Sequence, residues 1–235
     1  MNTVAAYVSH KLKMNNGKWV LNDGLRYNYS MLSAKFIDKS FFPFPYDEVQ
    51  QNNGALTGSI GLIYTPDNST KVALSASTGF RTPNVDDLTK VFDSEPGSIV
   101  VPNPEIKPEY TYNVDLNLVK VIADKVEIEV TGFYTIATNY FSVQPSLFDG
   151  EDSILYDGEL SQVLTTVNSE KAYLYGFNAG FDAKLGSFFT LTSYITYTYG
   201  RIETDTTPYP LDHIPPVYGK TALAFKKNKV KAEVY

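Results

Sequence analysis

Apolar and polar side chains alternate with a period of two along most of this chain. Within residues 70–80, for example, Val72, Leu74 and Ala76 share one side and are separated by small or polar residues. The alternation recurs within residues 110–121. Because successive side chains of a β-strand point to opposite faces, each segment predicts a strand with one apolar and one polar face.

Further segments show the same alternation, so we expect about ten strands in all. They are residues 4–14, 25–31, 56–64, 126–134, 173–184, 189–199, a strand containing Leu223 and Phe225, and a last strand ending at Tyr235. The hairpin is the only repeat, and no linker or change of composition marks a second domain. We therefore expect residues 1–235 to belong to a single domain.

Short turns and long connections alternate strictly between these strands. The long connections are residues 36–55, 79–108, 138–164 and 201–216. In an up-and-down meander, consecutive connections lie at opposite ends of the sheet, so all short turns are expected at one rim and all long loops at the other. The connection at 79–108 shows no helical period, and connections of that length usually either carry function or are disordered. It is the first place to look for a site.

These strands are typical of a transmembrane β-barrel. In such a barrel the apolar face meets lipid, the lumen is polar, and short turns and long loops occupy opposite rims. We therefore predict an all-β fold, an antiparallel up-and-down transmembrane β-barrel of which this chain forms part. The alternative is a soluble antiparallel barrel or sandwich whose polar side faces water. We favour the membrane interpretation because a soluble fold has no reason to segregate its turns by length.

Composition narrows the class of partner. The net charge of -6 disfavours nucleic acid, which requires a basic surface. Without cysteine, the chain has no disulfides, thiolate metal sites or cysteine nucleophile. No apolar run reaches the roughly 18 residues of a transmembrane helix, and the first residues lack the pattern of a signal peptide. Since the final residues AEVY resemble the middle of a strand, we expect the chain to be a piece of a larger protein.

Two motifs flank the long connection. Residues 80–88 read FRTPNVDDL and residues 101–109 read VPNPEIKPE. Together with the strands on either side, they resemble the paired FRAP and NPNL boxes of TonB-dependent outer-membrane receptors, most closely the haem and siderophore branch. Thr82 replaces the usual Ala, and Glu105-Ile106 replaces Asn-Leu. The residues that match the boxes are Phe80, Arg81, Pro83, Asn103, Pro104 and Pro108.

The resemblance implies a plugged barrel of about 22 strands in the outer membrane. It also implies uptake of a scarce ligand, such as a ferric siderophore or haem, powered by a TonB complex. The chain would be a fragment from the C-terminal half of that barrel, without the plug and the closing strands. The implied partners are membrane lipid, the missing plug and strands, TonB through the missing N-terminal part, and a small-molecule metal chelate.

Histidine bears on the choice of ligand. Haem-specific members of the family carry a histidine between the two boxes as an iron ligand, and none lies between Arg81 and Asn103 here. The two histidines present, His10 and His213, match no family motif. Haem therefore stays open, and a siderophore, a cobalamin-like ligand or another chelate is at least as well supported.

An aromatic run in the first long connection is a candidate for ligand binding. Residues 41–46 read FFPFPY, and Phe42, Phe44 and Tyr46 offer large flat surfaces. The equally supported alternative is that these rings, with Phe41, anchor the loop or join an interfacial aromatic girdle.

Polar residues of the first box are the other candidates. Arg81 is expected either to meet an anionic chelate through its planar guanidinium or to hold loop and strand together. Asn84, Asp86 and Asp87 follow it and are included in the candidate ligand-binding set.

Acidic residues in the loops raise the question of calcium. Asp86, Asp87, Asp93 and Glu95 form one group, and Asp149, Glu151 and Asp152 form another. Neither group has EF-hand spacing, so we expect solvated acidic loops, no metal site and no cofactor.

An enzyme is not expected. Serine, His213 and Asp212 are suitable residue types for hydrolysis, but no catalytic motif accompanies them, so an outer-membrane barrel hydrolase is the weakest alternative. A soluble secreted all-β domain that binds glycans or other ligands is the main alternative to a receptor.

Overall fold

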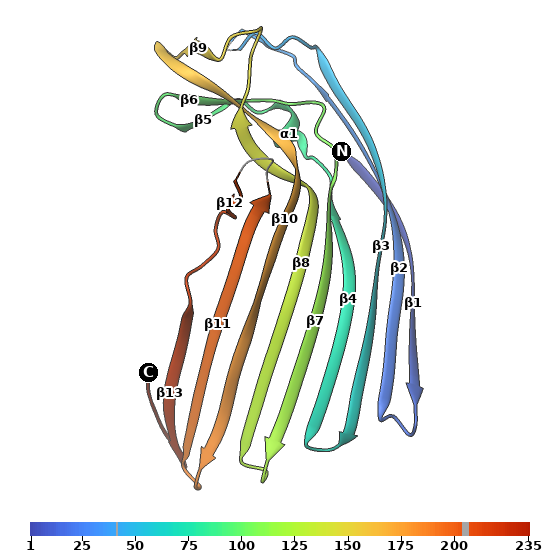
Figure 1. The fold of residues 1–235 in the computed structure, drawn as a ribbon, viewed down its shortest axis with the longest axis vertical. Coiled ribbons are helices and arrows are strands. Elements are labelled where there is room, and N and C mark those ends of the chain that lie inside the picture. The colour runs from blue at the N-terminus through green and yellow to red at the C-terminus, as the bar shows by residue number, and fades with distance from the viewer. Residues whose placement is uncertain (41, 204–206) are drawn as a thin grey trace.

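The computed structural model describes residues 1–40, 42–203 and 207–235, and within them ten long strands follow one another in an antiparallel meander. Figure 1 shows that they form one curved, open sheet. The ten strands are β1 (Asn2–Met14), β2 (Trp19–Lys35), β3 (Glu48–Asp67), β4 (Thr70–Arg81), β7 (Glu109–Ile122), β8 (Val126–Pro145), β10 (Glu159–Leu185), β11 (Phe189–Glu203), β13 (Tyr218–Lys227) and β14 (Val230–Val234). This topology confirms the predicted all-β, up-and-down fold of part of a barrel.

The short turns lie at one end of the sheet and the long connections at the other, as predicted (Figure 1). Left-handed backbone closes several of the turns. Asn15 and Asn16 have φ of 50° and 52°, and Ala123 and Asp124 have φ of 51° and 55°. Two successive left-handed residues give a hairpin turn whose twist matches that of the paired strands, which keeps these connections short.

The long connections carry small elements of their own. The segment between β4 and β7 contains α1 (Val85–Thr89), β5 (Phe92–Glu95) and β6 (Ser98–Val101). β9 (Ser153–Tyr156) precedes β10, and β12 (Tyr209–Pro210) pairs with β11. The connection at 79–108, whose sequence shows no helical period, therefore contains a helix and two short strands. α1 is only five residues long, too short to produce a 3.6-residue period in the sequence.

Several strands extend further toward the loops than the sequence predicted. Residues 138–145 and 159–164 were expected in a connection but belong to β8 and β10, and 48–55 belong to β3. These extensions are polar on both sides or lie beneath the loops, so apolar alternation no longer marks them. Backbone pairing continues nonetheless, as between Ser142 of β8 and Val167 of β10.

The two faces of the sheet differ in chemistry. On β7, Tyr112, Val114, Leu116 and Leu118 are exposed on the outer, convex face. The inner face is polar and joined by hydrogen bonds: Asn117 donates from Nδ2 to Glu129 Oε1 at 2.7 Å and to Thr131 Oγ1 at 2.8 Å. A contiguous exposed apolar face on a monomer marks a surface that another apolar phase covers. This arrangement fits lipid outside and water inside, and it argues against the soluble alternative.

Among the described residues, no helix is both long and apolar enough to cross a membrane.

We predict that a charge is tolerated on the inner face of β7 and not on the outer face. Leu116→Arg should lower the free energy of unfolding by about 2–4 kcal/mol, because the guanidinium would enter lipid. The matched variant Asn117→Arg places the same group one residue away, beside Glu129, and should cost less than half as much. Denaturant unfolding of the protein that carries this chain, folded into lipid vesicles, measures both values. Equal costs would contradict the assignment of the two faces.

Candidate functional site

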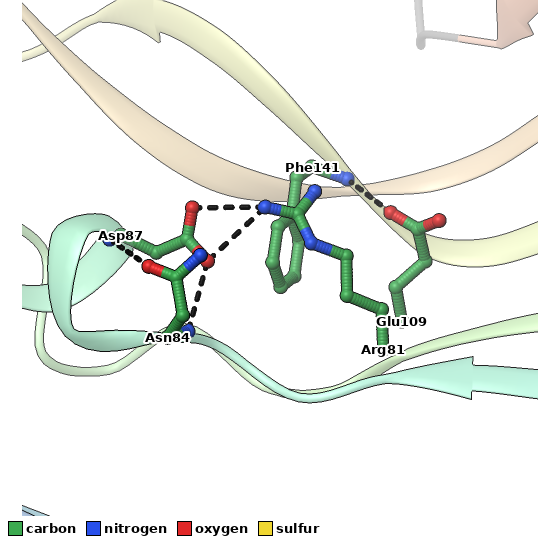
Figure 2. Close-up of polar contacts among 5 residues, drawn as sticks. All are labelled: Arg81, Asn84, Asp87, Glu109 and Phe141. Atoms are coloured by element: carbon green, nitrogen blue, oxygen red, sulfur yellow. Dashed lines mark hydrogen bonds and ion pairs between the residues drawn. The ribbon is translucent and has the colours of Figure 1, made fainter. Parts of the chain in front are cut away.

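The first box ties the β4–β7 connection to the barrel wall (Figure 2). Arg81, the last residue of β4, donates from Nη2 to both carboxylate oxygens of Asp87 at 2.9 and 3.1 Å. Its guanidinium also lies over the ring of Phe141 of β8, with 4.6 Å from Cζ to the ring centroid. Charge-assisted contacts of this kind are among the strongest hydrogen bonds in proteins. They are the contacts of a residue that holds loop and strand together, and a ligand contact by Arg81 stays a prediction.

A capping box starts α1 at the same place. Asp87 N–H donates to Asn84 Oδ1 at 2.9 Å, and Asn84 N–H donates to Asp87 Oδ2 at 2.9 Å. This reciprocal pair satisfies two backbone donors at the helix start. The Asp87 carboxylate therefore serves both the helix cap and Arg81, whereas Asp86 is exposed. The sequence placed Asn84, Asp86 and Asp87 in one candidate set, and the structure joins Asn84 and Asp87.

Apolar contacts fix the inward path of this connection. Pro83 and Leu88 are fully buried, and Leu88 packs with Leu32 and Val49 on the inner face of β2 and β3. Where the connection leaves β4, Phe80 stacks on Tyr110 of β7 on the outer side of the wall, with 6.2 Å between ring centroids. The connection thus folds over the mouth of the lumen.

The second box is held on both sides by side-chain amides. Gln51 of β3 donates from Nε2 to the carbonyls of Pro104 and Ile106, at 2.8 and 3.0 Å. On the other side, Asn103 donates from Nδ2 to the carbonyl of Thr166 at 2.9 Å. Because both ties engage the backbone, the box spans the space between β3 and β10.

Asn168 and Asn139 complete this clamp. Asn168 of β10 accepts from Lys107 N–H and donates to the Lys107 carbonyl, each at 2.8 Å. Asn139 of β8 donates from Nδ2 to the carbonyl of Pro108 at 3.2 Å. Sequence reasoning missed Gln51 and Asn139 because they lie in segments that were expected to be connections, and it missed Asn168 because residues 165–172 were assigned to no strand. Their amide side chains were the only available signal.

Aromatic rings join three of the long connections into one cap. Phe42 and Phe44 are buried, with exposed fractions of 2% and 5%, in a cluster with Ile99, Val101 and Val163. The Phe42 and Phe148 ring centroids lie 4.9 Å apart. Phe41 lies outside the described residues. The buried rings have the packing of the anchoring alternative, while their ligand-binding role stays a prediction.

A parallel strand pair reinforces this cap. Ser98–Val101 of β6 pair in register with Gln162–Thr165 of β10. Every residue of β6 is buried. Thr165 also donates from Oγ1 to the Val101 carbonyl at 2.9 Å. The connection at 79–108 is therefore attached to the wall through β6, at its middle, as well as through its two boxes.

A cavity of about 380 Å³ opens where the first three long connections meet. Its lining is rich in aromatic, proline and aliphatic residues, including Phe44, Tyr46, Pro104, Leu147 and Phe148. Burial raises the pKa of Tyr46, so its hydroxyl stays protonated and able to donate a hydrogen bond over a wide pH range.

The acidic residues do not converge on a metal site in the described part of the chain, where no group of three or more His, Asp or Glu side chains is placed to hold an ion. Asp93 and Glu95 line a second hollow of about 370 Å³ with Asp157 and Glu159. His10 lies on the apolar face of β1, and its Nδ1 is 3.0 Å from Asp23 Oδ2.

We predict that Asp87 stabilises the β4–β7 connection. Asp87→Ala should lower the free energy of local opening by about 1–3 kcal/mol, because it removes the helix cap and leaves Arg81 without its carboxylate. Hydrogen exchange of the amides in residues 84–90 reports this opening. Asp86→Ala removes a neighbouring exposed carboxylate of α1 and should leave the exchange rates unchanged. Equal protection in both variants would contradict the role of Asp87.

Comparison with known proteins identifies the family to which this chain belongs. The family model described as TonB dependent receptor-like, beta-barrel matches residues 1–230. The probable hemoglobin and hemoglobin-haptoglobin-binding protein 4 of Haemophilus influenzae (strain ATCC 51907 / DSM 11121 / KW20 / Rd) is 26% identical over 197 residues. That alignment covers 75% of this chain and 18% of the relative, so the chain spans less than a fifth of that protein's length.

Solved structures share the fold. The copper transporter OprC matches with a TM-score of 0.75 at 18% identity, over 98% of this chain and 32% of its own. The hemophore receptor HasR of Serratia marcescens, solved as a double mutant with its hemophore HasA and heme, matches with a TM-score of 0.74 at 15% identity, over 98% of this chain and 42% of its own. At such identities the likeness shows the fold. The match over residues 1–230 shows that the chain belongs to the family of TonB-dependent receptor β-barrels, which are outer-membrane proteins, as its two boxes predicted.

Proposed function

We propose that residues 1–235 form the loop-bearing wall of a receptor that captures a scarce metal chelate at the cell surface and imports it with energy from TonB. The rest of the barrel, the plug and the TonB-contacting segment would come from other parts of the receptor. Family membership supports this role, because relatives are described as receptors and transporters. On the same basis we propose that the chain is not an enzyme and has no nucleic-acid partner.

The observation that carries the proposal is the cavity in the loop cap. Its volume of about 380 Å³ lies in the range of small-molecule sites, roughly 300–1,000 Å³. It opens where three connections meet, so a ligand in it would contact all of them at once. Such a ligand would stabilise the arrangement of the loops that forms the cavity.

The chemistry of the lining indicates the class of ligand. Aromatic rings and prolines offer flat apolar surfaces, while Tyr46 and Asn103 add polar groups that can orient a ligand. Among the described lining residues, Asp149 is the one with a charged side chain. A bulky chelate whose surface is largely apolar and carries no excess negative charge fits this lining best.

Within that class, a ferric siderophore is favoured over haem. A haem-binding member of the family is expected to place a histidine between the two boxes, and none lies between Arg81 and Asn103. Haem nevertheless belongs in the test, because the Haemophilus relative is described as hemoglobin-binding and the HasR structure holds heme.

Uptake of radiolabelled iron tests the function. Cells that express the receptor carrying this chain should accumulate iron from a ferric siderophore or from haem, and deletion of TonB should abolish that accumulation. The two chelates, offered separately, distinguish the ligands. Uptake that is absent for every chelate, or unchanged without TonB, would overturn the proposal.

We predict that Leu147 contributes to ligand affinity. Leu147 lines the cavity and is 62% exposed, so Leu147→Ala should weaken binding by about tenfold through lost apolar contact while leaving the fold intact. Leu155 is 75% exposed and lies outside the cavity, so Leu155→Ala is the matched control. Titration of the purified receptor with each ferric chelate measures the change. Equal affinities in the two variants would show that this cavity is not part of the binding site.

A further inference from the structure

We propose that the outer wall carries a binding groove for one acyl chain of a membrane lipid, at the point where β3 and β4 separate. This goes beyond the ligand-uptake role and holds whichever chelate the receptor takes. It requires only that the outer face lies in the membrane, which family membership establishes.

The groove begins with a break in the backbone ladder. β3 and β4 pair from Tyr64↔Val72 to Ser59↔Ser77, and in-register pairing stops there. Beyond this point β3 stays with β2 as far as Lys35↔Glu48, while β4 stays with β7 as far as Arg81↔Glu109. In Figure 1 the two strands move apart toward the loop end. The wall therefore has a seam on its outer side.

A side chain closes the lower end of this seam. Thr78 Oγ1 accepts from Gly58 N–H at 2.9 Å and lies 3.4 Å from the Gly58 carbonyl oxygen, within donating distance. Backbone groups that face lipid must be paired within the protein. The Thr78 hydroxyl thus provides a hydrogen-bond partner for the Gly58 N–H and carbonyl, where the β3–β4 ladder no longer does. This pairing allows the seam to lie in the membrane.

Small residues shape the outer surface at this height. Gly58 lies beside Leu25 and opposite Thr78, and Ala76 lies between Ile60 and Val114 in register. Leu25 packs over Gly58, since a Cβ there would come within 2.8 Å of Leu25 Cδ2. Leu25 therefore forms part of the wall, and the small side chain of Ala76 lies in a groove of about 750 Å³ on the lipid-facing surface.

The walls of the groove are apolar and exposed. Leu25, Leu56 and Ile60 form one side, with Tyr112, Val114 and Tyr134 on the other. Within the part of the chain that the structure describes, the one carboxylate in the lining is that of Asp23, whose Oδ2 lies 3.0 Å from His10 Nδ1. The groove is thus continuous with the lipid-facing surface, and apolar walls suit a hydrocarbon chain. A lipid is the occupant that the membrane itself supplies.

Photo-crosslinking tests the groove. The receptor carrying this chain is reconstituted in phosphatidylethanolamine vesicles whose lipid bears a diazirine on one acyl chain, and labelled peptides are mapped after irradiation. We expect labels to concentrate in residues 56–60 and 112–114. Labelling spread evenly over the outer faces of β7, β8, β10 and β11 would overturn the proposal.

A filled groove provides the decisive comparison. Ala76→Phe places a ring on the groove floor without adding charge, and should lower labelling of these peptides by about tenfold, the change expected for losing contact with about two methylene groups. Ala179→Phe makes the same change on the same face of β10, between Val130 and Ile195, and should leave the labelling unchanged. Undiminished labelling in a folded Ala76→Phe receptor would overturn the proposal. If that variant fails to fold, the peptide map of the unmodified receptor decides.

Discussion

Pairing of backbone amides and carbonyls within the protein is the constraint on which this structure depends. Lipid offers these groups no partners, so a sheet can cross a bilayer only if each strand is paired along its sides. The strands between β1 and β14 meet this requirement by pairing with a neighbour on each side, whereas β1 and β14 are paired on one side only in the described chain. Where the β3–β4 ladder stops, the Thr78 hydroxyl takes over at Gly58. The alternation of apolar and polar residues is secondary to this pairing, because it decides only which face meets lipid.

At the loop end of the wall, the long connections form a cap that is stabilised mainly by side-chain contacts. Its stability comes from buried rings, from the contact between Arg81 and Asp87, and from amide side chains that bind backbone carbonyls. The two boxes are therefore anchors at the two ends of a single connection. Between them the connection folds inward and contributes to a cavity. The places at which the two boxes attach to the wall thus determine where the cavity forms and where a ligand can bind.

The strands of the wall could be predicted from the sequence because the two faces of each strand have different environments. One face of each strand meets lipid and the other the lumen, so alternation identified segments such as 70–80 and the turns between them. The same reasoning underestimated β10, which is 27 residues long, because its upper part lies among loops where neither face is lipid. The short helix α1 was missed for a related reason, since one capped helical turn leaves no period in the sequence.

The candidate site was only partly predictable. The boxes identified Arg81, Asn84 and Asp87, because motif residues stand close together in the sequence. Gln51 and Asn168 act on residues more than 50 positions away, and no local pattern marks such partners. The aromatic run at 41–46 was noticed, but burial of Phe42 and Phe44 depends on Ile99, Val101 and Val163 from other connections.

The parallel pairing of β6 with β10 has a consequence for the order of assembly. Each hairpin of the wall joins strands that are adjacent in the chain, whereas Val101 meets Thr165 across 64 intervening steps of sequence. Contacts between distant residues form late, since the entropy of closing the loop must be overcome first. The contacts of the cap are therefore expected to form after the hairpins of the wall, so assembly of the cap depends on a wall that is already in place.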